Sequence, residues 1–156
     1  MAYVEKSIQV SVPVRTAYDQ WTQFEEFPTF MEGVHEVKQL DDTHLHWSAK
    51  IGPKSEEWDT VITEQVPDQV VAWQSTSGAE NAGRVTFDHE SGETKVTVRI
   101  DYEPGGIIER IGSGLGFMDR RVSGDLDRFK AFIEGRGTET GAWRGEVEGG
   151  EVTSQS

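Results

Sequence analysis

The stretch PGGIIERIGSGLGFMDRRVSGDLDRFKAFIEG, residues 104–135, contains the longest periodic pattern in this chain. Its apolar residues recur at steps of three or four, the spacing that places side chains on one face of an α-helix: Ile108, Ile111, Leu115, Met118, Val122, Leu126, Phe129 and Ile133. Charged residues fall largely between them, which predicts one amphipathic helix over 107–134. At about 1.5 Å per residue this helix extends roughly 40 Å and needs an equally long apolar partner.

The rest of the chain supplies that partner as a run of strands. Apolar and polar residues alternate over 4–12, which predicts a first strand that Pro13 ends. Helical spacing over 14–24 and an aromatic-rich segment over 25–31, broken near Pro28, predict two short helices. Turn residues then separate six further strands, which we expect at 34–40, 45–51, 56–66, 70–77, 81–89 and 94–102. Their connections are too short for crossover helices, so these strands should pair antiparallel as a meander.

Length and composition indicate one domain. The chain has 156 residues, enough to bury roughly two-thirds of its unfolded surface around a single core. We assign that domain to residues 1–135. Residues 136–156 are rich in Gly, Glu, Ser and Thr without periodicity, so we expect a disordered tail in which Trp143 is the one large apolar group, available for a docking contact.

The charge balance argues against several kinds of partner. A net charge of -13 and a pI near 4.6 disfavour DNA, RNA and anionic membrane surfaces, because phosphate binding needs clustered Lys and Arg. The absence of cysteine excludes disulfides, thiolate nucleophiles and Cys-type zinc sites. No signal-peptide core and no run of eighteen apolar residues occurs, so we expect a soluble, cytoplasmic protein without a transmembrane segment. The oligomeric state is not readable from the sequence.

Strand alternation places most of the large aromatic residues on one face of the sheet. A curved sheet that grips one helix leaves more space than a single helical stripe fills, which favours an apolar ligand cavity; the alternative is that these rings simply fill the core. Thr60, Ser75, Asn81 and Tyr102 are the polar groups best placed to orient a ligand. The residues expected to bind it are Phe24, Phe27, Phe30, Met31, Trp47, Trp58, Thr60, Trp73, Ser75, Phe87, Tyr102, Leu115, Met118 and Val122.

A glycine-rich run, GSGLG at 112–116, lies past the expected start of the long helix. A dinucleotide fingerprint needs its glycines at a strand-to-helix turn, so nucleotide binding is disfavoured. Each glycine inside a helix costs roughly 0.5–1 kcal/mol relative to alanine. Close approach to the sheet or a ligand, a flexible gate and a frayed helix start each explain the run, and the sequence leaves them open.

Titratable groups are nearly absent from the inward-facing positions, so we predict no catalytic residue and no cofactor. His44 and His46 share a strand face on which Glu57 or Asp59 could complete a metal site. That face is the one assigned to solvent, and we predict no metal. Arg120 and Arg121 could form an anion site, but we interpret them as part of the solvated face of the long helix.

The predicted elements resemble the helix-grip fold of START and birch-pollen-allergen-like proteins, the SRPBCC superfamily. Four stretches are similar to its polyketide cyclase/dehydrase-like branch: VSVPVRTAY (10–18), FEEFPTFM (24–31), GRVTF (83–87) and DLDRFK (125–130). The resemblance covers roughly residues 3–135. It implies an α+β fold in which a seven-stranded curved antiparallel sheet wraps around the C-terminal helix and encloses an apolar cavity.

The resemblance also narrows the function. This superfamily includes lipid, quinone and polyketide binders as well as enzymes, and fold alone does not choose between them. Its polyketide aromatases are thought to orient substrate with arginine, tyrosine and serine, and no arginine here is predicted to face inward. We therefore predict a protein that binds a small hydrophobic ligand. A polyketide cyclase or dehydratase is the alternative, and a protein-interaction module with a filled core is a third.

Overall fold

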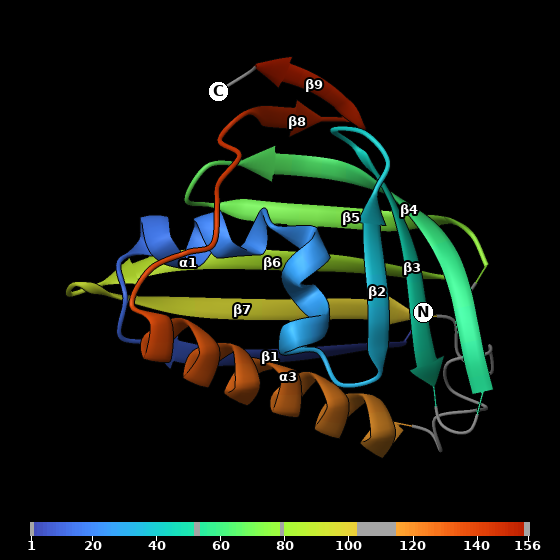
Figure 1. The fold of residues 1–156 in the computed structure, drawn as a ribbon, viewed down its shortest axis with the longest axis horizontal. Coiled ribbons are helices and arrows are strands. Elements are labelled where there is room, and N and C mark those ends of the chain that lie inside the picture. Colours follow the sequence, from blue (N-terminus) through green and yellow to red (C-terminus); the bar gives the residue numbers. More distant parts are fainter. Residues whose placement is uncertain (1, 52–53, 79, 103–114, 155–156) are drawn as a thin grey trace.

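The protein is one curved sheet with its helices on one side (Figure 1). The structure, a computed structural model, describes residues 2–51, 54–78, 80–102 and 115–154. Its elements are β1 (Ala2–Val10), α1 (Val14–Trp21), the 3-10 helix η1 (Phe24–Thr29), β2 (Val34–Gln39), β3 (His44–Ile51), β4 (Lys54–Val66), β5 (Val70–Ser77), β6 (Asn81–Glu90), β7 (Glu93–Tyr102), α3 (Leu115–Arg136), β8 (Glu146–Glu148) and β9 (Glu151–Ser154).

The seven predicted strands are confirmed, and they follow the order β1-β7-β6-β5-β4-β3-β2. Strands β2 to β7 form the expected antiparallel meander, and β1 closes it by pairing with β7. In this register Val96 lies opposite both Ile8 and Phe87, and Trp47 lies opposite Trp58. Because side chains alternate along a strand, these residues share the inner face of the sheet, toward the helices.

Helix α3 covers this inner face with the apolar stripe that its spacing predicts. Met118, Val122, Leu126, Phe129 and Ile133 are all buried. The helix ends at Arg136, two residues beyond the predicted end. The predicted helical residues 107–114, with the first glycines of the 112–116 run, lie outside the described residues, so the three interpretations of that run stay open.

Polar contacts fix α3 along β1. Lys6 pairs with Asp119 near the start of the helix at 2.8 Å, and Lys130 Nζ donates to the Gln9 carbonyl, farther along both elements, at 2.7 Å. The two elements therefore run in the same direction. This arrangement keeps the helical stripe over the sheet for its whole described length.

The second short helix is a 3-10 helix, and its sequence explains why. Phe24, Phe27 and Phe30 are spaced by three, the number of residues per turn in a 3-10 helix, so their rings fall on one side of the segment. All three are buried, with successive ring centroids 5.4 and 5.7 Å apart. Pro28 is tolerated in this short segment. These aromatic residues join η1 to the core.

The prediction of a disordered tail over 136–156 is wrong. Strand β8 pairs with β4, placing Val147 opposite Gln65, and β9 pairs with β8, so the described residues form a sheet of nine strands. Strand β3 pairs with β4 only from Lys54 to Val61, which leaves the far end of that edge for β8. Val147 is fully buried. The polar composition of the segment concealed a partner that lies about eighty residues earlier in the sequence.

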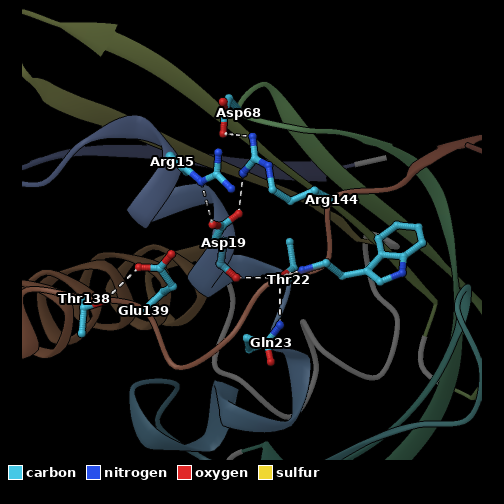
Figure 2. Close-up of polar contacts among 9 residues, drawn as sticks. Arg15, Asp19, Thr22, Gln23, Asp68, Thr138, Glu139 and Arg144 are labelled. Atoms are coloured by element: carbon cyan, nitrogen blue, oxygen red, sulfur yellow. Dashed lines mark hydrogen bonds and ion pairs between the residues drawn. The ribbon is translucent and has the colours of Figure 1, made fainter. Parts of the chain in front are cut away.

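Buried polar side chains on α1 hold the segment that leads to β8. Asp19 is only 1% exposed, and its carboxylate accepts a hydrogen bond from Arg144 at 2.5 Å (Figure 2). Arg144 also pairs with Asp68 at 2.8 Å, in the turn before β5. Thr22 Oγ1 accepts from the Trp143 N–H at 3.1 Å, and Trp143 packs against the core. The docking contact considered for Trp143 is therefore made within the chain.

Candidate functional site

A mainly apolar cavity of about 130 Å³ lies between the inner face of the sheet and α3. Strands β3 to β7 supply one wall and α3 the other. Among the described residues, the lining consists of Trp21, Met31, Val34, Trp47, Ala49, Trp58, Trp73, Asn81, Val98, Ile100, Met118, Arg121, Val122, Asp125 and Leu126. Only Asn81, Arg121 and Asp125 in this set have strongly polar side chains.

Three tryptophans on adjacent strands form the aromatic part of the wall. Trp47 and Trp58 face each other across β3 and β4 with parallel rings, 5.8 Å between centroids and 8° between planes. Trp73 on β5 lies 5.9 Å from Trp47. The Trp47 indole N–H donates to Thr60 Oγ1 at 2.9 Å, which satisfies the polar atom of a buried ring. Alternation along three strands is therefore enough to assemble this surface.

Gly83 on β6 makes room for one of these rings. A Cβ atom at this position would lie 2.4 Å from two atoms of the Trp73 indole. A side chain at position 83 is therefore incompatible with the present position of Trp73, and glycine is required because of close packing.

We expect Gly83→Ala to destabilise the protein by about 1–3 kcal/mol, because the added methyl group must push Trp73 off its position. Urea unfolding measures the effect. The control is Gly135→Ala near the end of α3, where a Cβ meets nothing within 4 Å. That change should instead stabilise the helix by about 0.5–1 kcal/mol. Equal effects of the two substitutions would contradict the packing argument.

The structure brings part of the predicted ligand set to the cavity. Met31, Trp47, Trp58, Trp73, Met118 and Val122 are among its lining residues. That they bind a ligand stays a prediction. The side chain of Leu115 lies outside the described residues.

The other predicted residues lie in the surrounding core. Phe24, Phe27 and Phe30 pack among the rings of η1 and its neighbours, away from the lining. Thr60 supports Trp47 from behind, Ser75 Oγ accepts the backbone N–H of Asn81 at 3.0 Å, and Phe87 packs edge-on against Tyr18. Tyr102 is buried at the end of β7 and is not among the lining residues.

Sequence reasoning missed the charged residues of the lining. The sequence pattern assigns Arg121 to the solvated face of the helix and gives Asp125 no role in the site. Both follow from the helical pattern, because Arg121 precedes Val122 and Asp125 precedes Leu126, so they border the apolar stripe at one helical turn. Where the apolar face of a helix lines a cavity, the polar residues beside that face border the cavity too.

Asp125 is a partly buried carboxyl that accepts two hydrogen bonds. It accepts hydrogen bonds from Arg128 Nη2 at 2.6 Å and from the Glu32 N–H at 3.0 Å. Burial raises the pKa of Asp125, and the two hydrogen bonds and the charges of Arg128 and Arg121 oppose that rise. Among the described lining residues, Asp125 is the one titratable carboxyl.

Trp21 contributes a buried polar atom. It lines the cavity, is 2% exposed, and its indole N–H has no hydrogen-bond acceptor among the described residues. Native structures rarely leave such a donor unsatisfied.

The two histidines considered for a metal site face different carboxylates. His44 Nδ1 lies 2.9 Å from Asp41 Oδ1, whereas His46 lies 2.6 Å from Asp59 Oδ1 and 2.8 Å from Glu57 Oε1. Within residues 2–51, 54–78, 80–102 and 115–154, no group of three or more His, Asp or Glu side chains is placed to hold a metal ion.

We expect His46 to titrate with a pKa above its usual 6.5, because its hydrogen bond to Asp59, and then that to Glu57, stabilises the imidazolium. The stability this cluster supplies is complete below the unfolded pKa and is lost as pH rises through the folded one. NMR titration of the imidazole signals measures the pKa. Asp59→Asn should lower it; the same midpoint in both proteins would contradict the assignment.

None of the described helices is both long and apolar enough to cross a lipid bilayer.

Comparison with known proteins identifies a matching family and solved structures with a similar fold. Residues 10–131 match the family described as "Polyketide cyclase / dehydrase and lipid transport". The chain is 52% identical over 149 residues to an uncharacterized 17.2 kDa protein from the melC2-rnhH intergenic region of Streptomyces lincolnensis, which covers 94% of this chain and 99% of that protein.

Two solved structures show the likeness in fold. A START superfamily protein from Mycobacterium smegmatis superimposes with a TM-score of 0.66 at 15% identity, over 86% of this chain and 95% of that one. The Zhui aromatase/cyclase from a Streptomyces species superimposes with a TM-score of 0.65 at 10% identity, over 87% of this chain and 93% of that one. The predicted helix-grip fold is therefore confirmed.

Proposed function

This chain belongs to the polyketide cyclase/dehydrase and lipid transport family, and from that premise we propose that it binds a small hydrophobic molecule between the sheet and α3. The observation that supports the proposal most directly is the cavity of about 130 Å³ walled by Trp47, Trp58, Trp73, Met118 and Val122. Burial of apolar surface drives binding in such a site, by about 25 cal/mol per Å² removed from water.

The dimensions of the cavity limit its ligand. An engineered apolar cavity of about 150 Å³ in another protein stays dry and binds benzene. A volume of about 130 Å³ therefore favours one ring or a short chain as the buried part of the ligand. A larger lipid, quinone or polyketide would extend beyond these walls.

A second candidate is a cyclase or dehydratase that acts on a polyketide-like substrate. Asp125 favours it, because an acid or base must border the cavity for proton transfer, and burial raises the pKa of this carboxyl. The hydrogen bonds from Arg128 and the Glu32 N–H engage the same carboxyl structurally, so ligand binding remains the first proposal.

A third reading, an interaction module with a filled core, is disfavoured by the cavity itself. The cytoplasmic location and the lack of a nucleic-acid partner stay predictions of the sequence alone.

Native mass spectrometry of the freshly purified protein tests the first proposal. We expect a bound mass that is released on unfolding, and calorimetric titration with 3-phenylpropan-1-ol should give saturable binding at one site. An unliganded mass together with no heat of binding for this alcohol would contradict the proposal. Turnover of a polyketide-like substrate that is lost in Asp125→Asn, with the fold intact, would favour the second candidate instead.

A further inference from the structure

The chain between α3 and β8, residues 137–145, passes along the C-terminal end of α1 (Figure 1). We call it the connecting segment. It lies beyond residues 10–131, the part of the chain that matches the family. Its residues are neither helical nor in a strand, so contacts with neighbouring elements determine where it lies.

Buried polar side chains at the end of α1 hold the connecting segment. The Gln20 side-chain amide binds Thr140 twice: its Nε2 donates to Thr140 Oγ1 at 3.0 Å, and its Oε1 accepts from the Thr140 N–H at 2.9 Å. Thr22 Oγ1 accepts from the Trp143 N–H at 3.1 Å. Gln20 is fully buried and Thr22 is 2% exposed. These side chains therefore depend on the segment for their partners.

Trp21 lies among these anchors in the sequence, but its ring lies on the cavity side. Successive helical residues are turned by about 100°, so Gln20 and Thr22 lie on either side of Trp21. Asp19, the partner of Arg144 in the connecting segment, lies nearly opposite Trp21 on the helix. Trp21 lines the cavity. The end of α1 therefore has the connecting segment on one side and the cavity on the other.

Release of the connecting segment would loosen the end of α1. This helix has only eight residues, and helices of that length depend on tertiary contacts for their stability. Water can replace the hydrogen bonds that the segment makes, but it does not hold the side chains in one position. The last turn, and Trp21 with it, would then leave the position that forms the cavity wall.

We propose that docking of the connecting segment and ligand binding in the cavity are coupled through the end of α1, so that each favours the other. The inference rests on the proposed function, because the coupled ligand is the hydrophobic molecule that occupies the cavity. A ligand in contact with Trp21 binds more tightly when the segment is docked, and by linkage it strengthens docking by the same factor. Residues 137–145 then regulate a cavity whose described lining includes none of them.

Hydrogen exchange of the full-length protein, with and without saturating 3-phenylpropan-1-ol, tests the coupling. The backbone amides of Thr140 and Trp143 report on docking, because both donate to side chains at the end of α1. We expect the alcohol to slow their exchange by about tenfold. The control is the Thr43 amide before β3, which donates to Asp41 Oδ1 at 2.9 Å and should change by less than about twofold. Equal slowing at Thr43 would overturn the coupling, since the alcohol would then stabilise the fold as a whole.

A variant of the connecting segment gives the reciprocal test. Arg144→Met combined with Thr140→Pro removes the charged donor to Asp19 and the N–H that donates to Gln20. It changes no residue of α1 or of the described cavity lining. We expect calorimetry to give about tenfold weaker binding of the alcohol, the factor expected from hydrogen exchange. Arg84→Met, a change of an exposed arginine on β6, should leave the affinity unchanged.

The two measurements separate the coupling from the proposed function. If the natural protein binds the alcohol but the Thr140 and Trp143 amides exchange at unchanged rates, the coupling is overturned and the proposed function stands. An unchanged affinity in the folded double variant has the same meaning. The exchange rates of the natural protein decide between these outcomes even if the double variant does not fold. Failure of the natural protein to bind the alcohol would overturn both proposals.

Discussion

Replacing Arg144 by methionine should lower the free energy of unfolding by about 3 kcal/mol, because it leaves the carboxylate of Asp19 buried without its charged donor. Asp19 is 1% exposed and Arg144 is 20% exposed by side chain, and the guanidinium also holds Asp68. Arg15 is the other cation near Asp19, at 3.7 Å, and is largely exposed. Urea unfolding near pH 8 measures the loss.

The pH dependence of the stability lost in Arg144→Met gives this prediction a second test. Burial already raises the pKa of Asp19, and the hydrogen bond and charge of Arg144 oppose that rise. Without Arg144 the folded-state pKa rises further, so the folded protein binds more protons than the unfolded chain over a wider range. Stability then falls as pH rises through that range. We therefore expect the variant to be destabilised less at pH 5 than at pH 8.

Arg84→Met is the matched control for this substitution. Arg84 pairs with Glu64 at 2.8 Å, but both side chains are exposed, by 49% and 39%. Exposed pairs of this kind contribute less than about 1 kcal/mol. If both variants lost the same small amount of unfolding free energy, the segment that leads to β8 would not depend on the buried pair of Asp19 and Arg144.

Replacing Ala49 by phenylalanine should reduce the affinity for 3-phenylpropan-1-ol by about 100-fold or more, because the new ring occupies the space that the ligand needs. Ala49 is buried on β3 and lines the cavity. The same change should leave the free energy of unfolding unchanged or raise it by up to about 0.5–2 kcal/mol, because the new ring fills a void in the apolar interior. Calorimetry and urea unfolding together measure these opposite effects.

Ala131→Phe is the control for ring addition, because Ala131 lies on the exposed side of α3. It should leave the affinity unchanged. Val122→Phe applies the same test from the helix side of the cavity. A ligand that binds as tightly to the Ala49 variant as to the natural protein would show that it binds elsewhere.

The elements that build the cavity were predictable because their signals are local. Met118, Val122 and Leu126 repeat at four residues, and Trp47 and Trp58 occupy inward positions that alternation alone identifies. Each prediction needs only a few neighbouring residues and the period of a helix or a strand. The same reasoning did not separate rings that line the cavity from rings that surround it, such as Phe24 and Phe27. That distinction depends on how closely distant elements approach.

Non-local contacts decide features that local patterns miss. Strict alternation along β4 turns Gln65 to the solvent face, but the register with β5 shifts between Ile62 and Glu64, and Gln65 is buried. Such a bulge changes the face of every residue that follows it. Likewise, the segment that leads to β8, which composition alone predicted to be disordered, satisfies the buried polar side chains of Asp19 on α1 and of Thr22 just after it.

Periodicity and turn residues act over one or two turns, so they were enough to predict the elements and their order, and the resemblance to a known family added the helix-grip fold. Contacts between distant elements decide that the C-terminal segment is folded, which residues line the cavity, and that Arg121 and Asp125 lie at its border. Those outcomes depend on contacts between residues far apart in the chain, such as Asp19 with Arg144 and Gly33 with Arg121, which no local pattern encodes.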